Sequence, residues 1–161
     1  MKNFQNKAKI IKVSAALRTL TFALFVFCLL GMAGVYANAL LAPLLLHQPF
    51  RFSMFLPIPE TVFALLAFYK LFRFFDRLRL GNFFDAQTVG NLNSAGTWWL
   101  AMWFLGIIHW FIIQSLYFEK FDWSQFQSDR WGWLFAGLAL KFVAWLLKEA
   151  QELKEEQELT V

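Results

Sequence analysis

The chain has only one cysteine and two histidines among its 161 residues. Cys28 therefore has no partner for an internal disulfide, and its apolar surroundings in the sequence suit a buried, inert thiol. So few thiol and imidazole ligands argue against an all-protein zinc site. The nucleophile-elbow, zinc-protease and phosphate-loop patterns are also missing. We therefore expect a protein that is not an enzyme and that holds no metal and no cofactor.

Charge is scarce as well, because charged residues make up 16% of the chain, against about 25% in soluble domains. Hydrophobic residues make up 59%, and they include 21 phenylalanines and eight tryptophans. A soluble domain this small cannot bury so much apolar surface, whereas lipid removes the need to do so. The net charge of +4 raises the alternative of nucleic-acid binding. No basic stripe alternates with exposed aromatics in a soluble segment, so we expect no direct contact with nucleic acid.

Residues 19–46 and 86–118 contain no charged side chain, and each stretch exceeds the roughly 20 residues that span a bilayer. We predict an all-α, integral membrane four-helix bundle that forms a single domain over residues 1–161. Its helices lie at about 19–45, 57–80, 95–117 and 131–147. A basic amphipathic helix precedes the first helix, and a charged helical tail, 148–161, follows the last. A cleaved signal peptide ending near Ala37-Asn38-Ala39 is the rival interpretation of the first segment.

Local signals mark the ends of the second and third helices. Pro57 suits a first helical turn, where Glu60 also complements the helix dipole. Gly81 followed by Asn82 is typical of a helix C-terminus, and Asp85 can cap a new helix from about Ala86. Small residues recur at Gly31, Gly34 and Ala37, which indicates either a close-packing face or ordinary small residues of a membrane helix.

The basic residues predict the orientation. Five Lys or Arg residues precede the first helix, four lie between the second and third, and two lie in the tail. Only Arg51, Lys120 and Arg130 fall on the other side. Basic segments stay in the cytoplasm, so both termini should face inward. Tryptophans favour headgroup level, which places Trp99 and Trp145 near the inner interface, and Trp133 near the outer one.

Three ionisable residues fall within the predicted membrane helices, where burial of a charge costs at least a few kcal/mol. Lys141 lies near the middle of the fourth helix, Glu60 lies one turn below the outer surface, and His109 lies in the outer half of the third helix. They are candidates for ligand binding or proton relay, with Glu60 as the nearest acid to Lys141 in depth. Snorkelling or an interhelical pair would explain Lys141 as a structural residue. The dipole would explain Glu60, and a satisfied core histidine would explain His109.

The predicted cytoplasmic surface combines the link between the second and third helices with the acidic tail. The tail can dock on the basic N-terminal helix, bind a basic cytosolic partner, or simply be a solvated helix end. The candidate partner-binding residues are Arg77, Arg79, Phe83, Phe84, Asp85, Glu149, Glu152, Glu155, Glu156 and Leu159.

The link, residues 74–89, and the tail, residues 149–161, carry a family resemblance. Gly81-Asn82-Phe83-Phe84 gives a G-x-x-F loop before the third helix, and Glu156-Gln157-Glu158-Leu159-Thr160-Val161 gives an acidic E-x-x-L-T-V ending. Together they resemble an uncharacterised bacterial family of small four-helix membrane proteins, catalogued as a domain of unknown function. Its members are often encoded beside a Cro-type helix-turn-helix regulator, which implies a link to transcriptional control. The resemblance supplies no catalytic residue.

These features leave three hypotheses. The first is a non-enzymatic regulator of the inner membrane that engages a cytosolic partner such as a helix-turn-helix transcription factor. The second is a small transporter or ligand-binding membrane module with a polar site around Lys141, which needs a homo-oligomer because four helices are few for a monomeric transporter. The third is a structural subunit of a larger complex.

Overall fold

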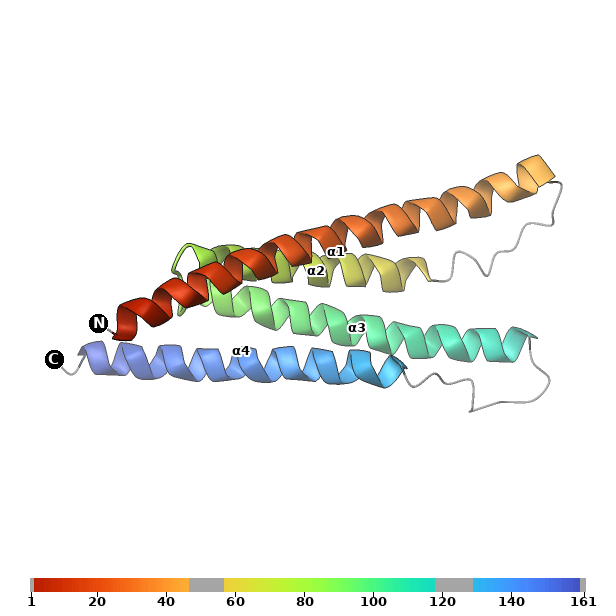
Figure 1. Ribbon diagram of the computed structural model, residues 1–161. Coiled ribbons are helices and arrows are strands. Elements are labelled where there is room, and N and C mark those ends of the chain that lie inside the picture. Colours follow the sequence, from red (N-terminus) through yellow and green to blue (C-terminus); the bar gives the residue numbers. More distant parts are fainter. Residues whose placement is uncertain (1, 47–56, 118–128, 160–161) are drawn as a thin grey trace.

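The computed structural model describes residues 2–46, 57–117 and 129–159, and the chain is helical there except at the α2–α3 link. The helices are α1 (Lys2–Leu46), α2 (Ile58–Arg79), α3 (Ala86–Tyr117) and α4 (Asp129–Leu159) (Figure 1). Successive helices run in opposite directions, and both termini lie at the same end of the bundle. The predicted outer loops, with Arg51 and Lys120, lie outside the described residues.

Helix α1 is one continuous helix of 45 residues, in which the predicted N-terminal extension before residue 19 runs into the apolar part without a break. No capping signal interrupts it at that point. Instead, the hydroxyls of Thr19 and Thr21 donate to the carbonyls of Ala15 and Leu17, one turn back in the same helix. Helix α3 begins at Ala86, where the Asp85 cap predicted a helix start. The polar residues before position 95 are therefore part of the same helix as the apolar span.

The end of α2 confirms the predicted glycine cap. Gly81 has a φ of 86°, a left-handed conformation that a side chain disfavours. The amide of Asn82 donates to the carbonyl of Arg77 at 3.1 Å, and that of Gly81 donates to Leu78 at 3.0 Å. These two bonds form a Schellman motif, which satisfies the last carbonyls of the helix.

The start of α3 confirms the predicted aspartate cap. The Oδ1 of Asp85 accepts the backbone N–H of Gln87 at 2.7 Å. Arg77 reaches from α2 to donate to both the Asp85 carboxylate and the Gln87 side chain. The buried Thr88 donates its hydroxyl to the carbonyl of Asn82 at 2.9 Å. These contacts fix the angle between the two helices.

The packed helix pairs are α1 with α2, α2 with α3, and α3 with α4. Two glycines let α3 and α4 approach closely. A Cβ at Gly137 would lie 2.8 Å from the Leu100 side chain, and one at Gly96 would lie 3.1 Å from the Gly137 carbonyl oxygen. The predicted alternative, a close-packing face at Gly31 and Gly34, makes no contact with the other described helices, because a Cβ at either glycine would meet none of their atoms within 4 Å.

The helices are offset along the bundle axis. The ring centroids of Trp99 and Trp133 lie 5.3 Å apart, and those of Trp103 and Trp131 lie 6.4 Å apart. The start of α4 therefore lies beside the middle of α3 (Figure 1). The placement of Trp99 and Trp133 at opposite membrane surfaces was wrong, because two rings 5.3 Å apart lie at nearly the same depth.

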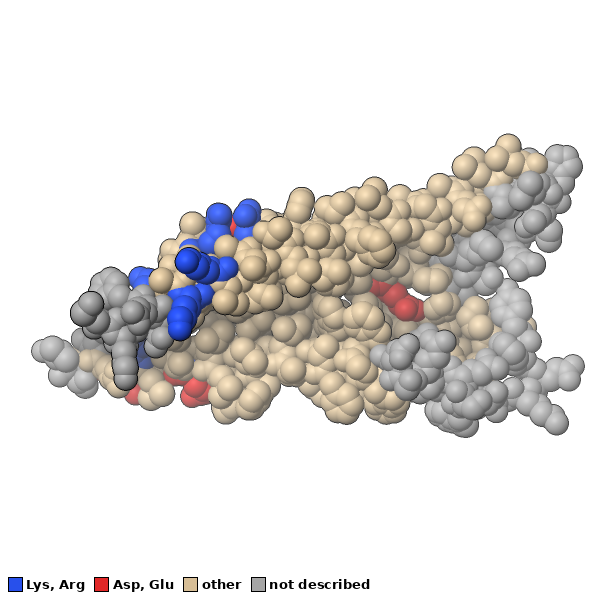
Figure 2. All heavy atoms as spheres, in the orientation of Figure 1, with Lys and Arg blue, Asp and Glu red and all other residues tan. Residues whose placement is uncertain are grey.

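The outer surface of the bundle is largely apolar. Large side chains such as Phe27 and Leu30 are 75% and 64% exposed, whereas Leu92 and Ala144 belong to a small buried core with Phe74. Three helices are long and apolar enough to cross a membrane, over Lys7–Leu41, Ala86–Leu116 and Trp131–Gln157. In the view of Figure 2, the Lys and Arg residues of the described chain gather toward the end that holds the termini.

Candidate functional site

Two of the three predicted intramembrane residues form a pair. The Nδ1 of His109 on α3 lies 2.7 Å from Oε1 of Glu60 in the first turn of α2. Their side chains are only 18% and 23% exposed, and α2 and α3 hold them in place by packing along their length. The pair therefore joins two helices through a contact that is largely removed from solvent.

Glu60 does not reach Lys141, because Glu60 pairs with His109 of α3 whereas Lys141 donates to Asn93, far along the same helix. Their partners, His109 and Asn93, lie 16 residues apart on α3, which is about 24 Å at 1.5 Å per residue, so the expected match in depth was wrong. Glu60 instead borders a separate hollow whose lining is mostly aromatic and apolar, with Trp99, Trp103 and Trp133 among its walls. Its carboxylate is already engaged by His109 on that side of the bundle.

The hollow beside Glu60 has a volume of about 650 Å³ and is bordered by all four helices. Cys28 of α1 lies on its wall and is half-buried, whereas the sequence predicted a buried thiol. Phe68 contacts Trp99 edge to face, with 5.3 Å between ring centroids. Aromatic packing therefore defines this part of the bundle, and among the described residues that border the hollow Glu60 is the one carboxylate.

Lys141 has a different environment. Its Nζ donates to Oδ1 of Asn93 on α3 at 3.0 Å, and its stem passes over Gly96. Among the described residues its ammonium forms no ion pair, so an amide oxygen is all that offsets the charge. Asn93 belongs to the polar first part of α3, and Lys141 therefore points toward the end of the bundle that holds the termini. Sequence reasoning had placed Asn93 at the inner interface but had not identified it as the partner of Lys141.

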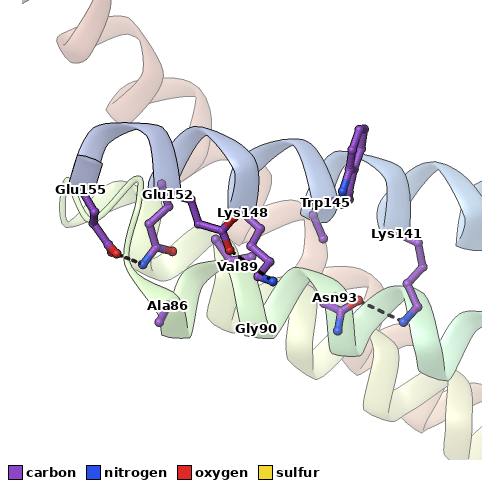
Figure 3. Close-up of a pocket in the computed structure, with 11 residues that line it drawn as sticks. Ala86, Val89, Gly90, Asn93, Lys141, Trp145, Lys148, Glu152 and Glu155 are labelled. Atoms are coloured by element: carbon purple, nitrogen blue, oxygen red, sulfur yellow. Dashed lines mark hydrogen bonds and ion pairs between the residues drawn. The ribbon is translucent and has the colours of Figure 1, made fainter. Parts of the chain in front are cut away.

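A groove of about 460 Å³ runs between α3 and α4 from Lys141 toward the tail (Figure 3). The α3 wall consists of small or neutral residues and the α4 wall carries all the charges. The lining residues are Ala86, Val89, Gly90, Asn93, Lys141, Ala144, Trp145, Lys148, Gln151, Glu152 and Glu155. Such an opening is large enough for a small organic group, because ligand pockets commonly begin at about 300 Å³.

The link residues divide into two groups. Arg77 and Asp85 are engaged with each other, and Arg79 lies 3.4 Å from Asp76, which also binds Arg18 of α1 at 2.8 Å. These ion pairs connect α1, α2 and the start of α3, so the charged link residues have structural roles inside the protein. The Arg18–Asp76 pair was not predicted, because nothing in the sequence sets the register between α1 and α2.

The aromatic link residues face an apolar groove of about 570 Å³. Phe84 is 44% exposed and Phe83 is half-buried, and both border this groove. The remaining lining residues come from α1, α2 and α4, and they are Lys7, Ile10, Phe74, Leu78, Val143 and Leu147. Phe83 and Phe84 therefore stay candidates for partner binding.

The tail extends α4 without a break to Leu159. The candidate acids Glu149, Glu152, Glu155 and Glu156 are all exposed. Lys148 pairs with Glu152 at 3.3 Å, and Gln151 donates to Glu155 at 2.9 Å, so these contacts stay within the tail itself. Two apolar side chains are exposed beside the acids, Leu153 at 59% and Leu159 at 87%. The tail thus presents acidic and apolar groups together on its surface.

The fold and its apolar exterior define an all-helical protein with three helices suited to a membrane. Within that class, residues 52–161 match the family described as "Protein of unknown function (DUF2975)", and the chain belongs to this family. The match includes α2, α3, α4 and the tail, and it leaves out α1. No curated protein and no solved structure matches the chain.

Proposed function

We propose that the chain is an integral protein of the bacterial inner membrane, with four crossings and both termini in the cytoplasm. The three long apolar helices support insertion. The fourth crossing is α2, which packs between α1 and α3 and runs antiparallel to both (Figure 1). Its charged second half would place Lys70 and Arg73 at the inner interface, where long basic side chains snorkel. An even number of crossings also agrees with the position of both termini at one end of the bundle.

The function that the geometry supports best is that of a non-enzymatic regulator that engages a cytosolic partner through its tail. The observation that carries this proposal is the exposed combination of four acids with Leu153 and Leu159 at the end of α4. An anionic inner leaflet repels an acidic helix, so the tail is available to a soluble partner with a basic surface. A helix-turn-helix transcription factor has such a surface, and the acids of the tail would compete with DNA for it. The family resemblance points to the same class of partner.

The test uses the full chain and two variants, in cells that also express the candidate regulator. One variant ends after Leu147, and the other replaces Glu149, Glu152, Glu155 and Glu156 with Gln. Gln keeps a high helix propensity, so the second variant removes charge and leaves the helix intact. Both variants should remain in the membrane fraction and lose co-purification of the partner, whereas Lys9→Gln with Lys12→Gln should retain it. Equal co-purification by the full chain and both variants would reject the proposal.

A second candidate function is a small, oligomeric ligand-binding or transport module, and the groove that reaches Lys141 favours it. This function predicts that uptake or ligand binding depends on Lys141 and is unaffected by loss of the tail. The tail truncation therefore separates the two functions, because a regulator loses its activity and a transporter keeps it.

A further inference from the structure

The charges of the α3–α4 groove follow a fixed order along α4. Lys141 lies at one end, Lys148 lies two turns further on, and Glu152 and Glu155 lie beyond it (Figure 3). A rise of 1.5 Å per residue puts about 10 Å between the two lysines and about 6 Å between Lys148 and Glu152. The facing wall of α3 contributes Asn93 as its main polar group. The groove is therefore cationic at one end and anionic at the other.

Trp145 indicates the depth of the groove in the proposed membrane. Its side chain is 53% exposed and points away from α3 (Figure 3). Indole rings of membrane proteins are enriched at headgroup level, and we place Trp145 there. Lys141 then lies about one turn deeper, and Lys148 and Glu152 lie progressively further out. The groove would thus cross the headgroup layer, where its cationic end faces the membrane and its anionic end faces the cytoplasm.

The cationic end has unused donors. The ammonium of Lys141 has three N–H groups, and Asn93 accepts from it through one oxygen. The amide nitrogen of Asn93 is itself a donor. Lys148 binds Glu152 at 3.3 Å, but these side chains are 65% and 52% exposed, so the pair is weak and can open. A group that fits here must carry several acceptor oxygens and negative charge, as a phosphate diester does.

The anionic end of the groove favours a ligand whose phosphate is linked to a cationic group. Glu152 and Glu155 accept hydrogen bonds, and each has a second carboxylate oxygen for another donor. An ethanolamine headgroup carries a primary ammonium with three donors, two carbons beyond its phosphate. A choline headgroup has no N–H donor, and a glycerol headgroup has no cation.

We propose that the groove binds the headgroup of an ethanolamine phospholipid. Its phosphate lies between Lys141 and Lys148, and its ammonium lies at Glu152. The proposal rests on the membrane insertion proposed above, and it adds a lipid ligand of defined chemistry. The phosphate would supply the negative charge that Lys141 lacks among the described residues.

The test is native mass spectrometry of the full chain in a mild nonionic detergent. Phosphatidylethanolamine, phosphatidylcholine and phosphatidylglycerol with identical acyl chains are added in turn. The wild-type protein should retain the ethanolamine lipid most strongly. Lys141→Met keeps the apolar stem over Gly96, and loss of one charge-assisted contact should weaken this binding about tenfold. Lys141→Arg should restore part of the binding, and Lys12→Met, a change of an exposed residue outside the groove, should have no effect.

Glu152→Gln tests the other end of the groove, and it should reduce the preference for ethanolamine over choline. Soluble phosphoethanolamine distinguishes the source of the headgroup. Failure of this compound to displace the lipid supports a membrane ligand, whereas tight binding of the compound alone would overturn the lipid assignment. Equal retention of the three lipids by the wild-type protein, or unchanged retention by Lys141→Met, would overturn the site itself.

Membrane fractionation of the same preparations separates this inference from the proposed function. A chain that stays in the membrane fraction and shows no headgroup preference refutes only the lipid site. A chain that is recovered without detergent in the soluble fraction refutes the membrane insertion on which both proposals depend.

Discussion

The pair of His109 and Glu60 gives the sharpest prediction about stability. It is the contact in which two of the predicted intramembrane residues meet, across the interface of α2 and α3. We consider a double-mutant cycle of Glu60→Gln, His109→Gln and the double variant. Each change keeps a polar side chain of similar reach, so the cycle isolates the interaction from simple loss of volume.

The magnitude follows from the burial of the pair. A hydrogen bond to a charged group contributes about 1.5–3 kcal/mol in soluble proteins, whereas polar contacts between membrane helices average about 0.6 and reach about 1.7 kcal/mol. The side chains are 18% and 23% exposed, which places this pair well inside the bundle but not fully removed from solvent. We expect a coupling free energy of about 1–2 kcal/mol, near the upper end of the range for membrane proteins.

The assay is reversible unfolding of the detergent-solubilised chain by increasing mole fractions of a denaturing detergent. The matched control is the same cycle on Lys148 and Glu152, whose side chains are 65% and 52% exposed. That pair should show a coupling below about 0.5 kcal/mol. A Glu60–His109 coupling no greater than that of the control would refute the reasoning that this contact joins α2 to α3.

Other positions test the helix packing and the link. Gly137→Ala forces a Cβ to 2.8 Å from Leu100, and Gly96→Ala meets backbone atoms at 3.1 Å, so each should destabilise the bundle by about 1–2 kcal/mol in the same unfolding assay. Gly90→Ala, with no atom within 4 Å of the added Cβ, should be neutral or stabilise α3 by up to about 1 kcal/mol, and destabilisation equal to that of Gly137→Ala would contradict the packing. Gly81→Ala should cost about 1 kcal/mol or more because of its φ of 86°, and an unchanged unfolding midpoint would argue against the left-handed cap. Asp85→Ala should cost about 1 kcal/mol through loss of the α3 cap, and Asp85→Asn should recover much of it.

The sequence predicted the local features of the fold better than its long-range ones. The four helices, the glycine cap at Gly81 and the aspartate cap at Asp85 depend on neighbouring residues, and such signals can be read along the chain. The offset between α3 and α4 depends on which turns of two helices pack together. The approach at Gly96 and Gly137 sets that offset, and glycine at either position looks in the sequence like any small residue of a membrane helix.

In the candidate site too, the sequence identified single residues but not the contacts between them. Lys141, Glu60 and His109 were identified because ionisable residues are rare in apolar helices. The sequence left their partners open, because position along one helix does not tell which residues of a neighbouring helix lie opposite. The polar first part of α3 could have identified Asn93 as the partner of Lys141. A lysine that snorkels toward the inner interface finds its nearest uncharged acceptors there. The ion-pair roles of Arg77 and Asp85 likewise became visible only with the geometry of the link.

The central claim is that four helices cross the membrane and leave both termini in the cytoplasm. The most direct measurement is labelling of single cysteines with a membrane-impermeant maleimide, in a Cys28→Ser background. Cysteines placed at Lys9, Phe84 and Glu156 should all be protected in intact cells and react after the membrane is opened. Labelling of the Glu156 cysteine in intact cells would contradict the account, because it would mean an odd number of crossings and a tail outside the cytoplasm.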